Sequence, residues 1–347
     1  MLKKEKNRRL LLAGIAAVTL LGASSAALAI EPVVELSYKP LQGKQTSVVF
    51  RHAKPSAKSA VKATSLDFRA RETAKPGASN ALGPTGNRYP GDLSYLGGPV
   101  VTSMQSHAVF VNPSSACPSN SCWGDPIGFL RDLGRSQFVH IIDQFTGATA
   151  SNRYTVGTNF AVSGVPTSSG PLTDATVEDI VAAVVQVSGQ TGYGHEYHVF
   201  LPPGVDECFD SSDTQCYSPD NFATFYYCAY HSSFDISGVG HVLYSVEPYQ
   251  DVPGCNDTGA TPNGAVVDST NNVLSHETFE TITDPDGDAW VNITNNDMYG
   301  SEIGDECSFV NATGFDPSVW HVGSRVYATQ PEYTNIQHTC NTNSGGN

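Results

Sequence analysis

The sequence predicts an α/β (α+β) fold in which a mixed β-sheet packs with helices and disulfide bonds hold the connections. From Tyr95 onward, runs typical of strands alternate with runs typical of helices. All eight cysteines lie in this part of the chain, which follows a segment typical of export. An even number of cysteines in an oxidising compartment favours disulfides over a metal site made of cysteines.

Residues 1–29 are predicted to be a secretory signal peptide. A basic start precedes an apolar run from Leu10 to Leu21, and small residues then lead to Ala27-Leu28-Ala29, a typical cleavage site. The alternative is a membrane anchor, but the apolar run is short, and no later segment has the ~18 apolar residues that span a bilayer. We therefore expect a secreted, extracellular or periplasmic protein without membrane contact after signal cleavage.

The rest of the chain divides by charge. Residues 30–90 form a basic, low-complexity leader with ten Lys or Arg and four Asp or Glu. Residues 91–347 form an acidic domain with four Arg, no Lys and 29 Asp or Glu, a net charge of −25. The leader is either a flexible, solvated linker or a propeptide that covers the acidic domain until it is removed. The acidic domain repels phosphate backbones, which excludes nucleic-acid binding.

Strands and helices are expected in the following order within the acidic domain. Composition predicts strands at residues 99–111, 154–162, 197–201, 225–231 and 242–246. Apolar spacing predicts one or two helices over 125–145 with a break near Gly134, and capping-type residues open another helix at Thr173. A helix from about Ala265 to Thr283 is stopped by Asp284-Pro285. The remainder is expected to be rich in loops.

The cysteine spacing favours two local disulfides, Cys117–Cys122 and Cys208–Cys216. Eight cysteines allow 105 pairings, so the spacing leaves the partners of the other four open. These four are expected to close longer loops, with Cys307 and Cys340 holding the last part of the chain.

The most specific motif is Ser275-His276-Glu277-Thr278-Phe279-Glu280. Residues four apart share one face of a helix, so His276 and Glu280 can both point at one ion. Glu277, roughly 100° around the helix, stands beside that ion and can take a proton from water. This is the geometry of H-E-x-x-H metallopeptidases with Glu in place of the second His. The alternative is a surface helix with solvated His and Glu side chains.

A third ligand is expected from a later segment, Glu302-Ile303-Gly304-Asp305. Glu302 fits the role of a ligand, and Asp305 fits that of a carboxylate that orients His276. The alternative is that these acids belong to an ordinary acidic surface.

Three other polar clusters are weaker candidates for a functional site. His195 and His198 are three apart, and on a strand they face opposite ways, so we interpret them as structural. His231 follows Cys228 at a strand end, where it either stabilises an oxyanion or is a buried, hydrogen-bonded histidine. The run Asp284-Pro-Asp-Gly-Asp288 resembles part of a calcium loop, so it is either a structural Ca²⁺ site or a plain turn.

Four motifs occur in the same order as in a known family. Gly97-Gly98-Pro99-Val100, Cys228-Ala-Tyr-His231, Ser275-His-Glu-x-x-Glu280 and Glu302-Ile-Gly-Asp305 make residues 94–330 resemble the EXORDIUM-like, phosphate-induced protein family. The resemblance implies an extracellular protein related to secreted plant cell-wall proteins. It implies no enzymatic activity, because the plant members are regarded as growth-related apoplastic proteins. Many of them keep only part of the His-Glu-x-x-Glu pattern, whereas this chain keeps all of it, which favours a working metal site. The chain departs from the family after Pro248, where a cysteine pair is expected and only Cys255 stands.

The motifs together favour a secreted zinc-dependent metallopeptidase with a zincin-like catalytic domain. In this hypothesis His276, Glu280 and Glu302 hold Zn²⁺, Glu277 is the general base, and Asp305 orients His276. The expected partner is an extracellular protein or peptide substrate, and the expected state is a monomer. The alternative is a non-catalytic, wall-associated or signalling protein in which the His/Glu site is structural or vestigial.

Overall fold

The structure is a computed structural model, and it describes residues 33–38, 66–67, 91–114, 116–118, 121–210, 212–218, 221, 223–252, 255, 261–294, 299–307 and 318–342. The predicted signal peptide lies outside these residues. Of the predicted leader, only two short strands are described, β1 (Val33–Ser37) and β2 (Leu66–Asp67).

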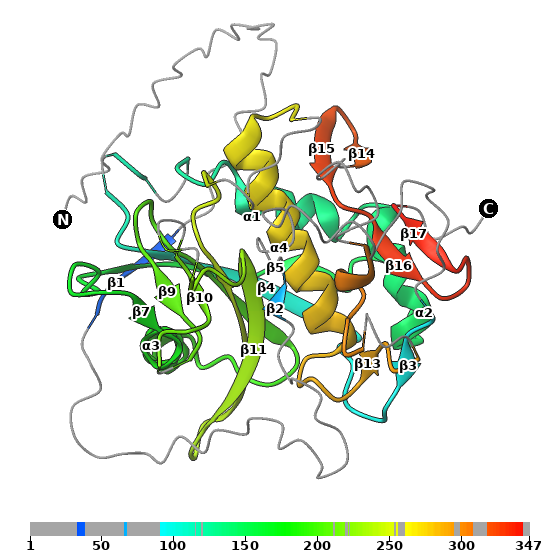
Figure 1. The fold of residues 1–347 in the computed structure, drawn as a ribbon, viewed down its shortest axis with the longest axis horizontal. Coiled ribbons are helices and arrows are strands. Elements are labelled where there is room, and N and C mark those ends of the chain that lie inside the picture. Colours follow the sequence, from blue (N-terminus) through cyan, green and yellow to red (C-terminus); the bar gives the residue numbers. More distant parts are fainter. Residues whose placement is uncertain are drawn as a thin grey trace, which may run out of the picture. The chain divides into compact units, whose positions relative to one another are not determined.

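A mixed eight-stranded sheet is the centre of the fold (Figure 1). Its strand order is β1-β6-β4-β8-β12-β11-β2, and β5 also pairs with β4. The pairs from β1 to β12 are parallel, whereas β11 runs antiparallel to both β12 and β2. The strands of this sheet that belong to the predicted acidic domain are β4 (Met104–Val111), β5 (Tyr154–Val156), β6 (Asn159–Ser163), β8 (His195–Phe200), β11 (Ala229–Ile236) and β12 (Gly240–Glu247).

Each face of the sheet carries its own hydrophobic core, because alternate side chains of a strand point to opposite faces. Val109 and Val111 of β4 pack in one core with helix α3 (Asp174–Ser188). Ala108 and Phe110 of the same strand pack in the other core with helices α1 (Pro126–Leu133) and α4 (Ala265–Thr283). Figure 1 shows α3 on one side of the sheet and α4 on the other. The predicted mixed sheet packed with helices is therefore confirmed.

The helix boundaries follow from local chemistry. Asp125 caps α1 by accepting a hydrogen bond from the Gly128 N–H, and Pro126 occupies the first helical position, where no N–H is needed. Thr173 caps α3 in the same way, and Gly189 ends it in the left-handed conformation. The 19-residue helix α4 ends at Thr283. Its predicted bounds are confirmed.

Some predicted elements differ from those observed. The region after Gly134 forms a 3₁₀-helix (Phe138–Ile142) and the short helix α2 (Asp143–Thr146). The strand expected at 154–162 is two strands, β5 and β6. The strand expected at 225–231 starts four residues later and continues to Ile236, because Phe225, Tyr227 and Cys228 lie in a buried segment before it.

The remaining strands form small sheets. One three-stranded sheet joins β7 (Leu172–Thr173), β9 (Glu207–Cys208) and β10 (Cys216–Tyr217). Two-stranded sheets join β3 (Ser94–Tyr95) with β13 (Trp290–Val291), β14 (Ser318–Val322) with β15 (Arg325–Thr329), and β16 (Glu332–Thr334) with β17 (Thr339–Asn341). The final part of the chain therefore has more regular structure than the sequence suggested.

All eight cysteines form disulfides. The predicted local pairs Cys117–Cys122 and Cys208–Cys216 are confirmed, and the other pairs are Cys228–Cys255 and Cys307–Cys340. Four disulfides are compatible with a secreted protein. Among the described helices, none combines the length and the apolar character required to cross a membrane.

Candidate metal centre

The candidate centre lies between helix α4, strand β11 and the segment from Glu302 to Asp305, the first residue of the 3₁₀-helix Asp305–Cys307 (η2). Helix α4 packs on the face of the sheet formed by β11 and β12. His231 of β11 is paired with Ser245 of β12, so both side chains belong to one face of the sheet. This face is the one that α4 covers (Figure 1).

The helix brings His276 and Glu280 together as their spacing requires. His276 Nε2 lies 3.2 Å from Glu280 Oε1, and both side chains are fully buried. Glu277 is also fully buried. The chain therefore places three ionisable side chains of one helix inside the protein, which excludes the alternative of a solvated surface helix.

The segment at residues 302–305 adds two carboxylates. Asp305 donates its backbone N–H to Glu280 Oε1 at 3.2 Å, and its side chain accepts the Glu302 N–H at 3.0 Å. Gly304 lies against the imidazole of His276, where a Cβ atom would stand 2.4 Å from Nδ1. This contact closes the Nδ1 side of the ring while Nε2 faces Glu280.

His231 is a buried histidine that faces this centre from the sheet. Its Nδ1 lies 3.3 Å from Glu277 Oε2 and 3.7 Å from Glu280 Oε2. Its Nε2 lies 3.6 Å from Glu302 Oε2 and 3.3 Å from the carbonyl oxygen of Asp284. The sequence suggested His231 only through its position after Cys228, and the structure brings it into contact with the motif on α4.

Two overlapping groups of potential ligands result among the described residues. One comprises His276, Glu280 and Asp305, and the other comprises His231, Glu280 and Glu302. In each group, one candidate ligand atom per residue lies within 4.8 Å of the others. Every residue proposed for the site from the sequence therefore belongs to one of these groups or, like Glu277, borders them.

Sequence reasoning missed a second set of buried polar groups beneath α4. Thr281 donates a hydrogen bond to Glu196 Oε1 at 2.7 Å, and His198 Nε2 lies 3.5 Å from Glu196 Oε2. Ser245 bonds to Glu247 Oε1 at 2.8 Å and to His198 Nδ1 at 2.8 Å. All these side chains are buried. The sequence does contain a sign of this set: polar residues stand two apart on each of two strands, in Glu196-x-His198 and Ser245-x-Glu247. Residues two apart on a strand share a face, so this pattern places all four polar side chains on one face of the sheet.

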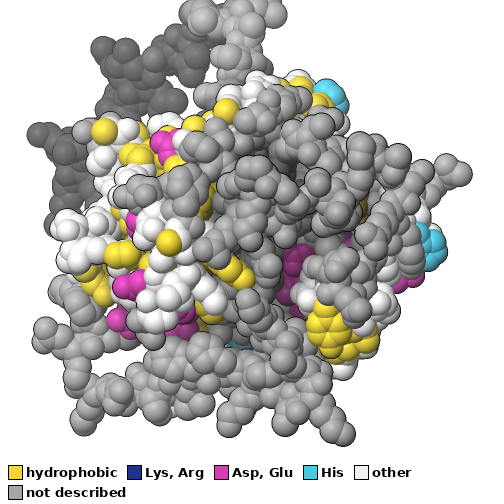
Figure 2. Space-filling view, in the orientation of Figure 1, with side chains coloured by type: hydrophobic (Ala, Val, Ile, Leu, Met, Phe, Trp, Pro, Cys, Tyr) yellow, Lys and Arg dark blue, Asp and Glu magenta, His cyan; other side chains and the backbone are white. Residues whose placement is uncertain are grey.

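The surroundings of the centre are strongly acidic. Burial and the nearby Glu277 raise the pKa of Glu247 and of Glu196 well above the ordinary value. Burial raises the pKa of Asp284 to about 6. On the face shown in Figure 2, acidic side chains are visible among the described residues and no Lys or Arg is. A bound cation would offset this concentration of carboxyl groups.

The other two polar motifs noted in the sequence, around His195 and Asp286, make hydrogen bonds to neighbouring parts of the fold. His195 lies 3.1 Å from His107 Nε2, on the face of β8 opposite to His198, as the strand spacing predicted. Asp286 bonds to Tyr193 at 2.6 Å, to Ser233 at 2.7 Å and to His241 at 3.0 Å. The turn at residues 284–288, which contains Asp286 and follows α4, is therefore tied to the β11–β12 hairpin through Ser233 and His241.

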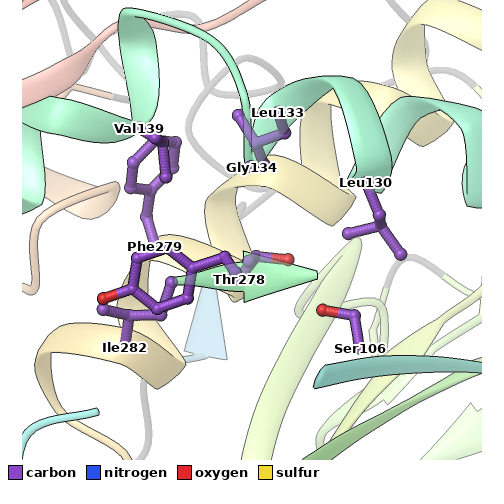
Figure 3. A pocket seen from close by; sticks show the side chains of 9 residues that line it. Ser106, Leu130, Leu133, Gly134, Val139, Thr278, Phe279 and Ile282 are labelled. Carbon is purple, nitrogen blue, oxygen red and sulfur yellow. The ribbon is translucent and has the colours of Figure 1, made fainter. Parts of the chain in front are cut away.

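A small cavity lies on the side of α4 that faces α1 (Figure 3). Its lining is mainly apolar and includes Leu130, Phe279 and Ile282, together with the hydroxyl-bearing Ser106 and Thr278. None of the candidate ligands lines it. We interpret it as a packing defect of the core.

Comparison of the chain with protein-family models, with curated proteins and with solved structures finds no significant match.

Proposed function

We propose that the protein is a secreted zinc-dependent metallopeptidase with a zincin-like catalytic domain, related to the EXORDIUM-like family. The observation that carries this proposal is the convergence of the buried His276 and Glu280 with Asp305, beside the buried carboxyl group of Glu277. The four disulfides are compatible with export.

The residues fit a zinc ion in type and in spacing. Imidazole nitrogens and carboxylate oxygens are ordinary zinc ligands, and ligand atoms of a tetrahedral site lie about 3.4 Å apart for bonds near 2.1 Å. The distance between His276 Nε2 and Glu280 Oε1 is 3.2 Å. Relative to the sequence-based hypothesis, we assign Asp305 as the third ligand, because it groups with His276 and Glu280.

Zinc bound at these residues would act as a Lewis acid, polarising the scissile carbonyl and lowering the pKa of the attacking water. Glu277 takes a proton from the attacking water while the hydroxyl oxygen bonds to the carbonyl carbon. Glu277 then passes this proton to the leaving amine as the C–N bond breaks. The contact of 3.3 Å between His231 Nδ1 and Glu277 Oε2 orients the carboxyl group for both transfers.

The test measures zinc content and peptide hydrolysis in the wild type and in Glu277→Gln. We expect zinc in both proteins and a loss of hydrolysis of about 10²–10⁴-fold in the variant, the range of a positioned general base. Glu178→Gln is the matched control, because Glu178 is also a buried helical glutamate but lies on α3. It should leave hydrolysis unchanged.

The second candidate function is a non-catalytic extracellular protein with a structural metal site. The observation in its favour is the full burial of His276, Glu277 and Glu280. A wild type that holds zinc and hydrolyses no peptide in a diverse library, including after removal of residues 30–90 by limited proteolysis, would establish this alternative. A wild type with neither zinc nor activity would contradict the metal centre itself.

A further inference from the structure

The two oxygens of the Glu280 carboxylate face different histidines. Oε1 lies 3.2 Å from His276 Nε2 and accepts the Asp305 N–H, whereas Oε2 lies 3.7 Å from His231 Nδ1. The two groups of potential ligands share Glu280 and no other residue. A carboxylate in this position can bind one ion through each oxygen.

The group around His231 offers a second set of donors. It contains one imidazole and two carboxylates, from Glu280 and Glu302, and all three residues are at least nine-tenths buried. The carbonyl oxygen of Asp284 lies 3.3 Å from His231 Nε2 and adds a neutral oxygen donor. The mixture of nitrogen and oxygen donors suits a divalent first-row transition ion.

The two nitrogens of His231 can serve different purposes. Nε2 faces Glu302 Oε2 at 3.6 Å and the carbonyl oxygen of Asp284 at 3.3 Å, whereas Glu280 Oε2 lies nearer Nδ1, at 3.7 Å. Nδ1 faces Glu277 Oε2 at 3.3 Å. A metal-binding histidine characteristically donates its other ring N–H to a carboxylate, which fixes the tautomer and the ring orientation. The orientation of Glu277 by His231 is therefore compatible with metal binding through Nε2.

The number of carboxylates at the site also matches the charge of two divalent cations. Glu277, Glu280, Glu302 and Asp305 carry four negative charges when ionised, and the two histidines are neutral when they bind metal. One divalent ion leaves a net charge of −2 in a buried region, whereas two divalent ions neutralise it. Burying unbalanced charge is costly, so the second cation stabilises this arrangement.

We propose that the protein binds two divalent metal ions, one at His276, Glu280 and Asp305 and one at His231, Glu280 and Glu302, with Glu280 as the bridging carboxylate. The second position rests on the proposed metal centre at His276 and extends it to a two-metal site. In such sites the ions lie about 3.5–4 Å apart and contact the attacking and leaving groups together.

The experiment measures zinc per chain by mass spectrometry in the full protein, after metal removal, reloading with ZnCl₂ and desalting. We expect two ions in the wild type and one ion in each of His276→Ala and His231→Ala. His321→Ala is the control, because His321 is exposed on β14, and it should retain two ions. Cobalt loading adds a second readout, since two Co²⁺ ions that share a carboxylate couple magnetically.

The outcomes separate this proposal from the proposed function. One zinc in the wild type, lost in His276→Ala and kept in His231→Ala, overturns the second position and leaves the peptidase proposal standing. No zinc in the wild type overturns both. Two ions that persist in both histidine variants indicate binding elsewhere and overturn the two-metal site. Circular dichroism identifies a variant that fails to fold, and His231→Gln then replaces His231→Ala.

Discussion

At the residue scale, Gly304 controls the orientation of His276. The backbone of Gly304 lies against the imidazole so closely that a Cβ atom would stand 2.4 Å from Nδ1 and 2.6 Å from Cε1. The ring cannot remain in place beside a methyl group at that distance. The neighbouring carbonyl of Gly304 is held by Gln330 at 2.8 Å, so the backbone has little freedom to retreat.

We therefore expect Gly304→Ala to weaken zinc binding by about 10–100-fold, the range found when groups that orient a metal ligand are changed. Competition with a zinc chelator measures the effect. Gly194→Ala is the control, because the Cβ there meets no atom within 4 Å. Equal zinc affinity in both variants would show that the His276 ring does not depend on this contact.

At the element scale, α4 is held in register on the sheet by a buried polar bond. Thr281 donates to Glu196 Oε1 at 2.7 Å, and both side chains are at most 1 % exposed. Thr281 follows Glu280 directly, so a shift of the helix at this point moves the proposed ligands. Thr283 is equally buried, but its hydroxyl bonds only to carbonyl groups of its own helix.

Thr281→Val should lower the free energy of unfolding by about 1–3 kcal/mol, because it leaves a buried carboxyl group without its donor. Thr283→Val should cost less, since a hydroxyl bond to the preceding turn contributes little to a helix. Urea denaturation of both variants compares them. A larger loss for Thr283→Val would contradict the role assigned to Glu196.

The disulfide Cys307–Cys340 ties the segment with Glu302 and Asp305 to β17. Replacing both cysteines with alanine should lower stability by about 2–5 kcal/mol and should weaken zinc binding, because the loop that bears Asp305 loses an anchor. The same replacement at Cys117 and Cys122 opens a much shorter loop. It should cost less stability and leave the zinc affinity unchanged.

The sequence predicted those elements that local chemistry determines. The proline after Asp284 was sufficient to place the end of α4, and the spacing of His276 and Glu280 was sufficient to place both side chains on one side of the helix. The start of β11 was predicted wrongly because Phe225 and Tyr227 are as apolar as strand residues but pack in a loop beside the core. The buried groups Glu196 and Glu247 were missed because their burial depends on α4 crossing the sheet, a contact between distant parts of the chain.

At the scale of the whole molecule, residues 91–347 also bury carboxyl groups on the face of the sheet opposite to the candidate metal centre. Glu207 is fully buried and accepts hydrogen bonds from Tyr227 and Tyr230, and burial raises its pKa well above the ordinary value. Tyr230 and Tyr244 also donate to the buried Asp174. Burial, followed by repulsion from Asp174 and Asp179, raises the pKa of Glu178 to about 8. The interior on the α3 side thus prefers protonated carboxyl groups.

This preference predicts greater stability in acid. A carboxyl group whose folded pKa exceeds its unfolded value stabilises the fold below the unfolded pKa, and this contribution is lost as the pH rises through the folded pKa. For Glu178 the window runs from about 4.5 to about 8. Asp210 acts in the opposite direction, but its folded pKa of about 2 confines its effect to pH below about 4. His107 and His198 also oppose the trend, because burial lowers their pKa to about 4 and about 3, so they favour the fold above about pH 6.5. The buried carboxyl groups with raised pKa outnumber these histidines, since Glu196, Glu207, Glu247 and Glu306 act in the same direction as Glu178. The unfolding temperature should therefore be higher at pH 5 than at pH 8.

Glu178→Gln imitates the protonated side chain and tests this argument directly. It should raise stability at pH 8 by on the order of 1–3 kcal/mol and change it little at pH 5, so the stability curve becomes flatter. Thermal unfolding between pH 4.5 and 8.5 measures the difference. The control is Asp213→Asn, since Asp213 is exposed and Asn tolerates its left-handed backbone. If Glu178→Gln and Asp213→Asn give the same pH profile, the buried carboxyl on α3 does not set the acid preference of the fold.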